Sequence, residues 1–384
     1  MKTVYLNKFK VIEPRYKMAQ DALLQWTVAA HQVAETYQSD IATAKLGPES
    51  IQTLFKRFGV KAALIGQRFT ECDDIFSTEF NTNPIYQVTA ERPHGADIHT
   101  RANFFSERAF SVFKKIYDVN QVQQKPDHLI HVTCTGYISP SAAQRIVTEK
   151  FWNQATAITH AYHMGCYAAL PAVRLAKSLV RDECETNKNF TTDIVHTEMC
   201  SLHMNPSAQT PEQMVVQTLF ADGHIKYSAS AVKNQDGKNL KVITLLEKVV
   251  PDSQHDMSWI PTLWGLQMNL SRDVPEKIKS QLKIFSNELF AKAGLDVASA
   301  LKSVFAIHPG GPKIIDSVQQ CLELADHQIT ESRDILFQRG NMSSATLPHV
   351  WDKILEQNYP VGTKVISFAF GPGLTLFGSV FEIC

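Results

Sequence analysis

Two widely separated stretches of this chain repeat one order of elements: a short apolar run, a polar or glycine-rich turn, and a helical pattern. The first copy reads as a strand, a loop and a helix at residues 128–133, 134–140 and 141–150. The second copy has the same three parts at residues 304–307, 308–312 and 313–324. Strands that alternate with helices are typical of an α/β core. The repetition therefore predicts an α/β fold built from two related halves.

The length of the chain supports a division into two halves. A chain of 384 residues is long for one compact core. A turn-rich stretch, Asn234-Gln-Asp-Gly237, separates two strand-like runs. We therefore place the boundary there, between residues 1–234 and 235–384. Ahead of the first repeat, residues 30–68, with a break at Gly47-Pro48, and residues 99–117 are predicted to be mostly helical.

The composition excludes some classes of function. The chain has 38 basic and 38 acidic side chains, which argues against nucleic acid as the main partner because phosphate binding needs a surplus of Lys and Arg. Seven scattered cysteines without a CxxC pair predict free thiols in a reducing compartment, and no metal site. The N-terminus lacks the apolar segment of a secretory signal, and no apolar run approaches the roughly 18 residues of a membrane span. We therefore expect a cytoplasmic protein.

The first segment that carries chemistry leads from His163-Met-Gly-Cys into a run of small and aliphatic residues that predicts a buried helix. Cys166 is expected at or just before the N-terminus of that helix, where free N–H groups favour thiolate over thiol. Gly165 allows a strained turn with close access for a substrate. Pro171 fits only within the first helical turn. The alternative is that Cys166 is a buried small residue without a chemical role.

The second and third segments offer a histidine and a carboxamide. His308 ends an apolar strand and is followed by prolines and glycines that fix the turn, so it can hold a thiolate or donate to an oxyanion. Asn341 is flanked by small residues that leave room for its N–H bonds to reach an oxyanion. The alternatives are a packed histidine at a strand end and a helix N-cap at Asn341 or Ser343. A fourth segment, residues 369–375, is by itself only a glycine turn.

Together these segments resemble one family. HMGCYAALPAVRLA, FAIHPGGPKIID, RGNMSSAT and FGPGLT, in this order, resemble the signature segments of chalcone synthase-like type III polyketide synthases. The resemblance extends from about Lys56 to Phe377. It implies the thiolase fold, a duplicated five-layered αβαβα core that normally forms a homodimer, and it implies no cofactor beyond the coenzyme A (CoA) thioesters of the substrates.

The resemblance also implies a mechanism. Cys166 carries the acyl chain, His308 stabilises the thiolate, and His308 and Asn341 bind the thioester carbonyl of malonyl-CoA while carbon dioxide leaves. Phe220 matches an aromatic gate between the CoA tunnel and the active site. The residues expected at the CoA tunnel are Lys56, Arg57, Lys61, Gly310 and Gly311, although a solvated helix face accounts equally well for the three cations. The residues expected to contact the acyl chain are Phe220, Cys134, Thr135, Ser139, Cys200, His203, Trp259, Met268, Ser343, Gly371 and Pro372.

The substrate expectation follows from the segments that line the site. Residues 200–203 and 257–259 are more similar to bacterial alkylpyrone and alkylresorcinol synthases, which accept fatty acyl starters, than to plant chalcone synthases. We therefore expect a medium- or long-chain acyl-CoA starter, or its delivery by an acyl carrier protein, although the same apolar side chains also suit core packing. Two alternatives stay open: a single-condensation ketoacyl synthase of the same fold, and a non-catalytic acyl- or CoA-binding protein. A papain-like hydrolase also uses Cys, His and Asn, but the sequence around Cys166 is not of that type.

Overall fold

The computed structural model describes residues 2–38, 50–118 and 125–384. The described helices are α1 (Gln20–Gln38), α2 (Ile51–Phe58), α3 (Ile98–Ile116), α4 (Ala142–Glu149), α5 (Ala169–Glu183), α6 (Pro211–Leu219), α7 (Val274–Lys292), α8 (Val297–Ala300), α9 (Pro312–Leu322), α10 (Thr330–Arg339) and α11 (Thr346–Glu356). Short 3₁₀ helices lie at Asp73–Phe76, Cys200–His203, Asp326–Gln328 and Ser343–Ala345.

The described strands are β1 (Tyr5–Ile12), β2 (Tyr16–Ala19), β3 (Gln67–Thr70), β4 (His128–Thr133), β5 (Ala157–Tyr162), β6 (Thr191–Met199), β7 (Asp222–Ser230), β8 (Leu240–Val249), β9 (Met257–Pro261), β10 (Leu266–Leu270), β11 (Val304–Ile307), β12 (Lys364–Gly371) and β13 (Thr375–Ile383). Nine of them form one sheet in the order β11-β12-β13-β8-β1-β7-β6-β4-β5, while β2–β3 and β9–β10 form two small antiparallel pairs. In the large sheet, β4 pairs in parallel with β5 and β6, and β11 pairs in parallel with β12.

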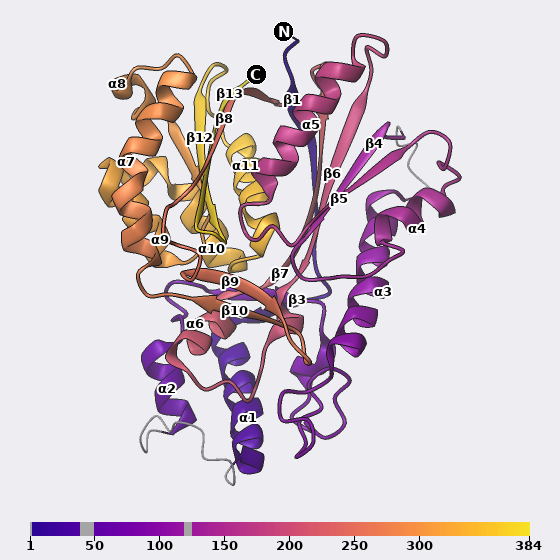
Figure 1. The fold of residues 1–384 in the computed structure, drawn as a ribbon, viewed down its shortest axis with the longest axis vertical. Helices are drawn as coiled ribbons and strands as arrows, with labels where there is room; N and C mark the ends of the chain where they lie inside the picture. Colours follow the sequence, from indigo (N-terminus) through magenta and orange to yellow (C-terminus); the bar gives the residue numbers. More distant parts are fainter. Residues whose placement is uncertain (1, 39–49, 119–124) are drawn as a thin grey trace.

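The elements stack in five layers (Figure 1). Helices α7 and α9 cover one outer face, and α3 and α4 cover the other. Between them lie two groups of strands, β11, β12, β13 and β8 on one side and β7, β6, β4 and β5 on the other, with α5 and α11 sandwiched in the middle. This αβαβα arrangement is the thiolase fold, and it confirms the predicted fold class.

The central layer explains why the buried face of α5, residues 169–183, is built from small apolar side chains. Residues Ala169, Ala172, Val173, Ala176 and Val180 of α5 are buried in the same apolar cluster as strands from both groups. Small side chains let the two sheet faces approach this helix closely. Pro171 lies in the first turn of α5, where no intrahelical hydrogen bond is lost.

The two repeated segments occupy equivalent places. β4 leads through a loop to α4, whose N-cap Ser141 accepts a hydrogen bond from the Gln144 N–H in a capping box. β11 leads through residues 308–311 to α9. Both predicted copies of strand, loop and helix are confirmed. Residues 234–237 lie between β7 and β8, and β1 joins the two groups of strands by pairing with both of them.

One predicted helix was too long. Residues 30–38 belong to α1 and Ile51–Phe58 to α2, while the break at Gly47-Pro48 lies outside the described residues. The last part of the predicted stretch is strand β3, which pairs with β2. This prediction was wrong because the pairing with β2 and the burial of Arg68 and Phe69, which are set by distant parts of the chain, outweigh local helix propensity. The predicted helix at residues 99–117 is confirmed as α3.

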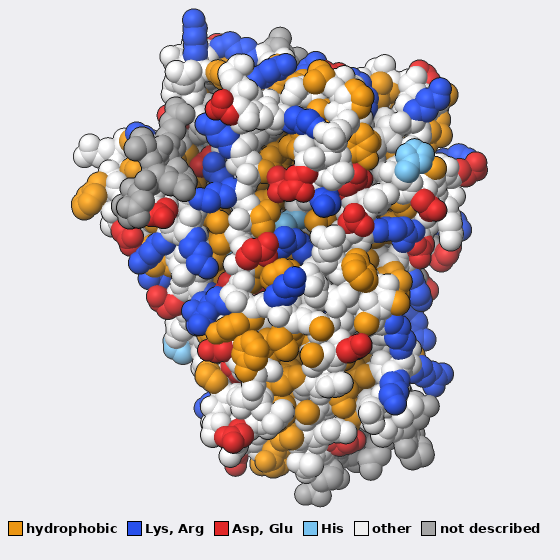
Figure 2. All heavy atoms as spheres, turned by 180° about the vertical axis from the view of Figure 1, so that it is seen from behind, with side chains coloured by type: hydrophobic (Ala, Val, Ile, Leu, Met, Phe, Trp, Pro, Cys, Tyr) orange, Lys and Arg blue, Asp and Glu red, His pale blue; other side chains and the backbone are white. Residues whose placement is uncertain are grey.

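The rear face carries side chains of both charges in alternation. Figure 2 shows Lys and Arg interspersed with Asp and Glu over much of this face, with apolar side chains gathered in its lower half. The mixed surface agrees with the equal numbers of acidic and basic residues in the chain. Among the described residues, no helix combines the length and apolar character needed to cross a bilayer.

Candidate active site

The segments with predicted chemistry meet at the carboxyl ends of parallel strands. Cys134 follows β4, the Cys166 turn follows β5, and His308 follows β11. The residue Gly371 is the last of β12. In α/β sheets this edge is where loops from different strands converge on one crevice. The fold therefore brings Cys134 and Gly371, which are 237 residues apart in the sequence (371 − 134), to the same end of the sheet.

The nucleophile candidate lies in a turn of three residues that precedes α5. Gly165 has a φ of +86°, a conformation that L side chains rarely adopt. A Cβ added there would lie 2.4 Å from Cδ of Pro372, and one added at Gly371 would lie 2.1 Å from Cδ1 of Tyr167. The two glycines therefore let the turn at residues 371–373 pack directly against the turn that presents Cys166. Sequence reasoning expected acyl contacts for Gly371 and Pro372, whereas the structure packs them against this turn.

The Cys134 thiol holds the other side of the same turn. Its Sγ accepts a hydrogen bond from the Gly165 N–H (3.1 Å) and donates to the Gly165 carbonyl (3.3 Å). Its own N–H donates to both carboxylate oxygens of Glu198 (3.1 and 3.0 Å), and its carbonyl accepts from the Trp259 indole (2.5 Å). Burial raises the pKa of Cys134 well above its usual range, so it remains a thiol that can donate.

Burial also controls the protonation of the two reactive groups. It raises the pKa of Cys166 to about 12, although the Ser343 hydroxyl and the Asn341 amide act in the opposite direction. It lowers the pKa of His308 to about 3. The sequence predicted that a helix N-terminus favours the thiolate, but α5 begins only at Ala169. In the substrate-free site, desolvation is the largest influence on both pKa values, and it disfavours the charged form of each group.

His308 is held by its backbone and leaves its ring free. Its N–H donates to the Phe368 carbonyl of β12 (2.7 Å), which fixes the residue at the end of β11. The side chain is 1% exposed, yet neither ring nitrogen has a hydrogen-bond partner among the described residues. Buried polar groups are nearly always paired, so two free ring nitrogens at a cavity wall require an explanation. A ligand that supplies an oxygen or exchanges a proton provides one.

Asn341 presents an oriented amide. Its Oδ1 accepts hydrogen bonds from the Ser343 N–H (2.9 Å) and the Thr346 hydroxyl (3.3 Å). Because the oxygen accepts from two donors, the amide nitrogen Nδ2 must lie on the opposite side. There it donates a long hydrogen bond to the Gly310 carbonyl (3.5 Å). The backbone of Asn341 forms a bridge with Phe220. The second N–H of this amide thus remains available to an incoming oxygen.

One cavity of about 570 Å³ joins these groups. Cys166, His308 and Asn341 all line it, as do Phe220 and Met268. Gly310 and Gly311 form another part of its wall. Most of the other lining side chains are apolar, from α2, α6, α7 and α9. A thiol, an imidazole and a carboxamide from three distant segments therefore face one space large enough for a drug-sized ligand.

Four cations line the same cavity: Arg57, Lys61, Arg272 and Lys313. Arg57 and Lys61 are two of the three cations that the sequence predicted there, whereas Lys56 is exposed on α2 and does not line the cavity. Sequence reasoning missed Arg272 and Lys313. Arg272 comes just before α7, and Lys313 lies in the first turn of α9, two residues after Gly311, and this position was the available signal. Cations of this kind suit phosphate groups.

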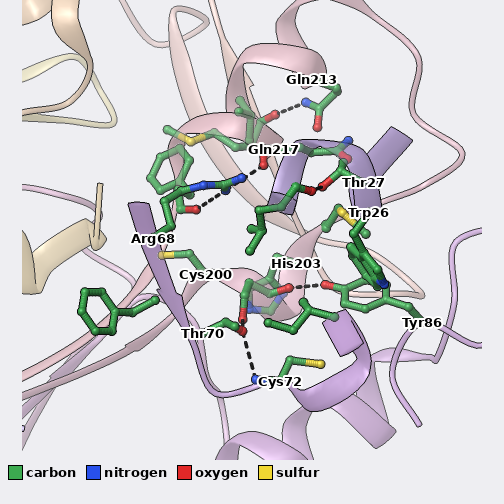
Figure 3. Close-up of a pocket in the computed structure, with 18 of the residues that line it drawn as sticks. Trp26, Thr27, Arg68, Thr70, Cys72, Tyr86, Cys200, His203, Gln213 and Gln217 are labelled. Atoms are coloured by element: carbon green, nitrogen blue, oxygen red, sulfur yellow. Dashed lines mark hydrogen bonds between the residues drawn. The ribbon is translucent and has the colours of Figure 1, made fainter. Parts of the chain in front are cut away.

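A second, smaller cavity, which we call the inner chamber (Figure 3), has a volume of about 50 Å³. Phe220 and Met268 line both spaces. Three of the residues predicted to contact an acyl chain, Cys200, His203 and Trp259, line only the inner chamber. Phe220 therefore lies at the partition between the two spaces, the place expected for a gate.

Hydrogen bonds fix two rings of the inner chamber. The His203 Nε2 lies 2.9 Å from the Thr135 carbonyl, and its Nδ1 accepts from the Leu266 N–H (3.1 Å). Trp259 meets the His203 ring edge-on, with centroids 5.4 Å apart. Trp259 also donates to the Cys134 carbonyl. This wall of the inner chamber is therefore connected through Cys134 to the turn that presents Cys166.

The remaining residues predicted to contact the acyl chain do not line either cavity. Thr135 is buried and donates to Glu198 (2.8 Å), while Ser139 is exposed in the loop after β4. Ser343 does not line either cavity, and its hydroxyl lies 3.9 Å from the Cys166 Sγ. The sequence placed Glu198 in a lining segment but assigned it no role. Its buried carboxylate also accepts from the Ser344 hydroxyl and so connects the Cys134 loop with the loop of Asn341. Burial raises the pKa of Glu198.

Sequence models of one family match nearly the whole chain. The N-terminal domain of chalcone and stilbene synthases matches residues 26–233, and their C-terminal domain matches residues 241–383. The chain belongs to the chalcone and stilbene synthase family. This family membership confirms the resemblance found from the four motifs.

Two curated relatives in this family are polyketide synthases. A probable polyketide synthase 1 of Dictyostelium discoideum is 29% identical over 255 residues, or 65% of this chain, and the matched region is 8% of that protein. Type III polyketide synthase C of Arabidopsis thaliana is 26% identical over 257 residues, again 65% of this chain and 66% of that protein. The chain thus spans a small part of the first relative and just under two thirds of the second.

Solved structures of the family share the fold. The C-terminal type III polyketide synthase domain of Steely1, a type I/III hybrid from Dictyostelium, superposes with a TM-score of 0.81 at 23% identity, covering 99% of both chains. PKS-I from the brown alga Ectocarpus siliculosus gives 0.82 at 19% identity, covering 100% of this chain and 99% of that one. 1,3,6,8-Tetrahydroxynaphthalene synthase from Streptomyces coelicolor gives 0.75 at 20% identity, covering 98% and 99%. At these identities the likeness shows the thiolase fold.

Proposed function

We propose that this protein is a type III polyketide synthase that condenses malonyl-CoA with an acyl group carried on Cys166. The observation that carries the proposal is the convergence of Cys166, His308 and Asn341 on one cavity, with two unpaired ring nitrogens on His308. The family membership supports the same activity. A protein that only binds acyl-CoA has no need of a thiol in that position.

In the first step the Cys166 sulfur attacks the thioester carbonyl of the starter. The neutral imidazole of His308 takes the thiol proton as attack begins, and the resulting imidazolium pairs with the developing charge. The bond between the carbonyl carbon and the CoA sulfur breaks, and CoA leaves with that proton. The acyl group remains on Cys166 as a thioester.

In the second step malonyl-CoA loses carbon dioxide. The bond between its carboxyl carbon and the α carbon breaks, and the electron pair passes to an enolate whose oxygen accepts hydrogen bonds from His308 and Asn341. The α carbon attacks the acyl carbonyl on Cys166, the carbon–sulfur bond breaks, and the chain moves to CoA with two more carbons. Transfer of the product back to Cys166 allows another cycle.

The proposal also specifies the chemical identity of the starter. A medium- or long-chain acyl-CoA, giving an alkylpyrone or alkylresorcinol, is supported by the largely apolar wall of the 570 Å³ cavity. The four cations of the cavity support CoA as the carrier of the acyl groups, and an acyl carrier protein is the alternative donor. We also propose that the protein forms a homodimer and acts in the cytoplasm.

Product analysis tests the proposal directly. The protein is incubated with isotope-labelled malonyl-CoA and a ladder of acyl-CoAs, and extracts are examined by mass spectrometry. We expect pyrones or resorcinols that contain two or more malonyl-derived units. A product with only one such unit would identify a single-condensation ketoacyl synthase instead. Bound acyl-CoA without release of carbon dioxide would identify a binding protein and refute the catalytic proposal.

A further inference from the structure

Two arginines are buried among the described residues, and they differ in how completely they are paired. Arg101 is 0% exposed and donates hydrogen bonds from Nε, Nη1 and Nη2 to backbone carbonyls, including those of Ala96 (2.9 Å), Met204 (3.1 Å) and His94 (2.6 Å). Each of its nitrogens has a partner. A buried cation that is satisfied in this way has a structural role.

Arg68 is buried to nearly the same extent, with 3% exposure, but is not fully paired. Its Nε donates to Gln20 Oε1 (2.7 Å), and its Nη1 donates to the carbonyls of Gln217 (3.0 Å) and Phe220 (2.8 Å). Its Nη2 has no hydrogen-bond partner among the described residues. A buried donor without a partner is destabilising, and more so when it is charged.

The hydrogen-bond partners of Arg68 among the described residues are an amide oxygen and two backbone carbonyls, and none is a carboxylate. Asp222 is the acid that acts on its pKa, which burial lowers to about 10. The oxygens of Asp222 accept from the N–H and hydroxyl of Ser201 (2.8 and 2.7 Å) and from the Glu71 N–H (2.7 Å). The oxygens of Asp222 therefore already accept hydrogen bonds from other donors. Because its pKa stays near 10, Arg68 is a cation at neutral pH.

The unpaired guanidinium belongs to the wall of the inner chamber. Figure 3 shows Arg68 extending from β3 toward Gln217, among the residues that surround this space. The chamber meets the active-site cavity at Phe220, whose carbonyl Arg68 also holds. A group that entered from the side of Cys166, past Phe220 and Met268, would thus reach a buried cation with a free donor.

We propose that Arg68 binds an oxygen at the far end of the starter acyl chain, so that the preferred starter is an ω-oxygenated acyl thioester, foremost an ω-carboxyacyl-CoA. This inference rests on the proposed function, because the chain must be carried on Cys166. The carboxylate fits the guanidinium in charge and shape, and it fills the hydrogen-bonding capacity that Nη2 leaves open.

The dimensions of the chamber agree with such a group. A water-sized atom occupies roughly 10–15 Å³ of such a volume, so 50 Å³ holds about four atoms. A carboxylate and its adjoining methylene are four non-hydrogen atoms. Leu23, Trp26 and Ile75 make the rest of the chamber largely apolar and suit the methylene part of the chain. An alkyl terminus in the same place would leave the cation unpaired.

The test compares starters of equal length on the unmodified protein. Acyl-CoA, ω-hydroxyacyl-CoA and ω-carboxyacyl-CoA of matched chain lengths are supplied, and loading of Cys166 is followed by intact-protein mass spectrometry. We expect the ω-carboxy starter to load with a kcat/KM about tenfold above that of the alkyl starter. A similar gain for the ω-hydroxy starter supports the same site with a neutral oxygen. Equal rates for all three starters would overturn the inference, since water alone then satisfies Arg68.

Two variants locate the effect. Arg68→Gln removes the charge, and Cys200→Leu fills the chamber from another wall; both should erase the preference for oxygenated starters. Thermal unfolding of each variant shows whether it folds, and the comparison of starters on the unmodified protein stands even if Arg68→Gln does not. Persistence of the preference in both folded variants would refute the role of Arg68. Failure of the proposed function has a different signature: no starter loads Cys166 and malonyl-CoA releases no carbon dioxide.

Discussion

The active-site cavity and the inner chamber meet at Phe220 and Met268 but have different walls. The cavity collects its reactive groups from loops at strand ends, where Cys166, His308 and Asn341 face a space that also holds four cations. The inner chamber is lined by side chains of α1, β3 and α6 and contains one buried guanidinium. The contrast indicates a division of roles in which loops supply the proposed chemistry and the packed elements behind them supply the proposed selection of the acyl chain.

The largest expected effect comes from removing the nucleophile of the active-site cavity, a change that leaves the inner chamber unaltered. Cys166→Ala removes the only thiol that lines the cavity among the described residues, so acyl loading should fall below detection, a loss of at least about 10⁴-fold. Intact-protein mass spectrometry with acyl-CoA measures it. Cys72→Ala, at a buried thiol that lines only the chamber, is the matched control. Loading of the Cys166→Ala protein at another site would contradict the assignment.

The next effect separates decarboxylation from loading. Asn341→Ala removes an amide that we propose binds the enolate oxygen, so release of carbon dioxide from malonyl-CoA should fall by about 10²–10³-fold. Loading of the starter should fall much less, because Cys166 keeps His308. Labelled carbon dioxide and acyl-enzyme are measured in parallel. An equal loss of both would indicate a general structural role for Asn341.

The pH dependence of Cys166 tests the electrostatics of the cavity. Because its pKa is raised to about 12, the thiolate is a small fraction at neutral pH and grows with each unit of pH below that value. Alkylation of the substrate-free protein by iodoacetamide should therefore rise about 100-fold between pH 7 and pH 9. Mass spectrometry of the Cys166 peptide gives the rate. A rate that is already at its plateau at pH 7 would show a preformed ion pair with His308.

Removing the hydrogen bonds between Cys134 and Gly165 should have a smaller effect on the loading of Cys166. Cys134→Ala leaves the Gly165 N–H without its thiol partner and the Gly165 carbonyl without one of its donors, so loading of Cys166 should slow by about tenfold, a change of about 1.4 kcal/mol. Cys134→Ser keeps a donor and acceptor and should retain most of the rate. If the serine variant is as slow as the alanine variant, the hydrogen bonds to Gly165 do not explain the effect.

The smallest effect concerns the cations of the cavity. Lys61→Ala should raise the KM for malonyl-CoA by a few fold at low salt, and the difference should shrink as salt screens the phosphates. Lys56→Ala is the matched control, because Lys56 is exposed and lies outside the cavity wall. Equal changes in the two variants would show that the effect is one of overall charge rather than of position.

The sequence predicted the elements that depend on contiguous residues. The strand, loop and helix after residue 128 and after residue 304 were readable because apolar runs, turn residues and caps lie next to each other in the chain. Cys166, His308 and Asn341 stood out because each is framed by Gly, Pro or small residues in a short segment. The residues 67–68 were misread as helical because their strand depends on β2, about 50 residues earlier, a pairing that local pattern does not contain.

The division into two spaces could not be predicted from the sequence. The residues Cys200, His203 and Trp259 were identified as lining residues, but only packing around Phe220 assigns them to the inner chamber. Arg68 was not noticed, since a single Arg in a short polar stretch resembles any surface residue. Its burial arises from α1 and α6, which contribute Gln20 and Gln217 from either side in the sequence. Such side-chain relations between distant elements leave no local pattern.

The proposed cavity separates two roles, acyl loading by Cys166 and decarboxylation by His308 and Asn341, and a single variant tests this separation directly. Cys166→Gln cannot carry an acyl group but leaves His308 and Asn341 in place. Carbon dioxide released from malonyl-CoA and acyl groups bound to the protein are measured in the same reaction. The account predicts continued release of carbon dioxide with no acyl-enzyme. Loss of carbon dioxide release to the same extent as acyl loading would contradict it.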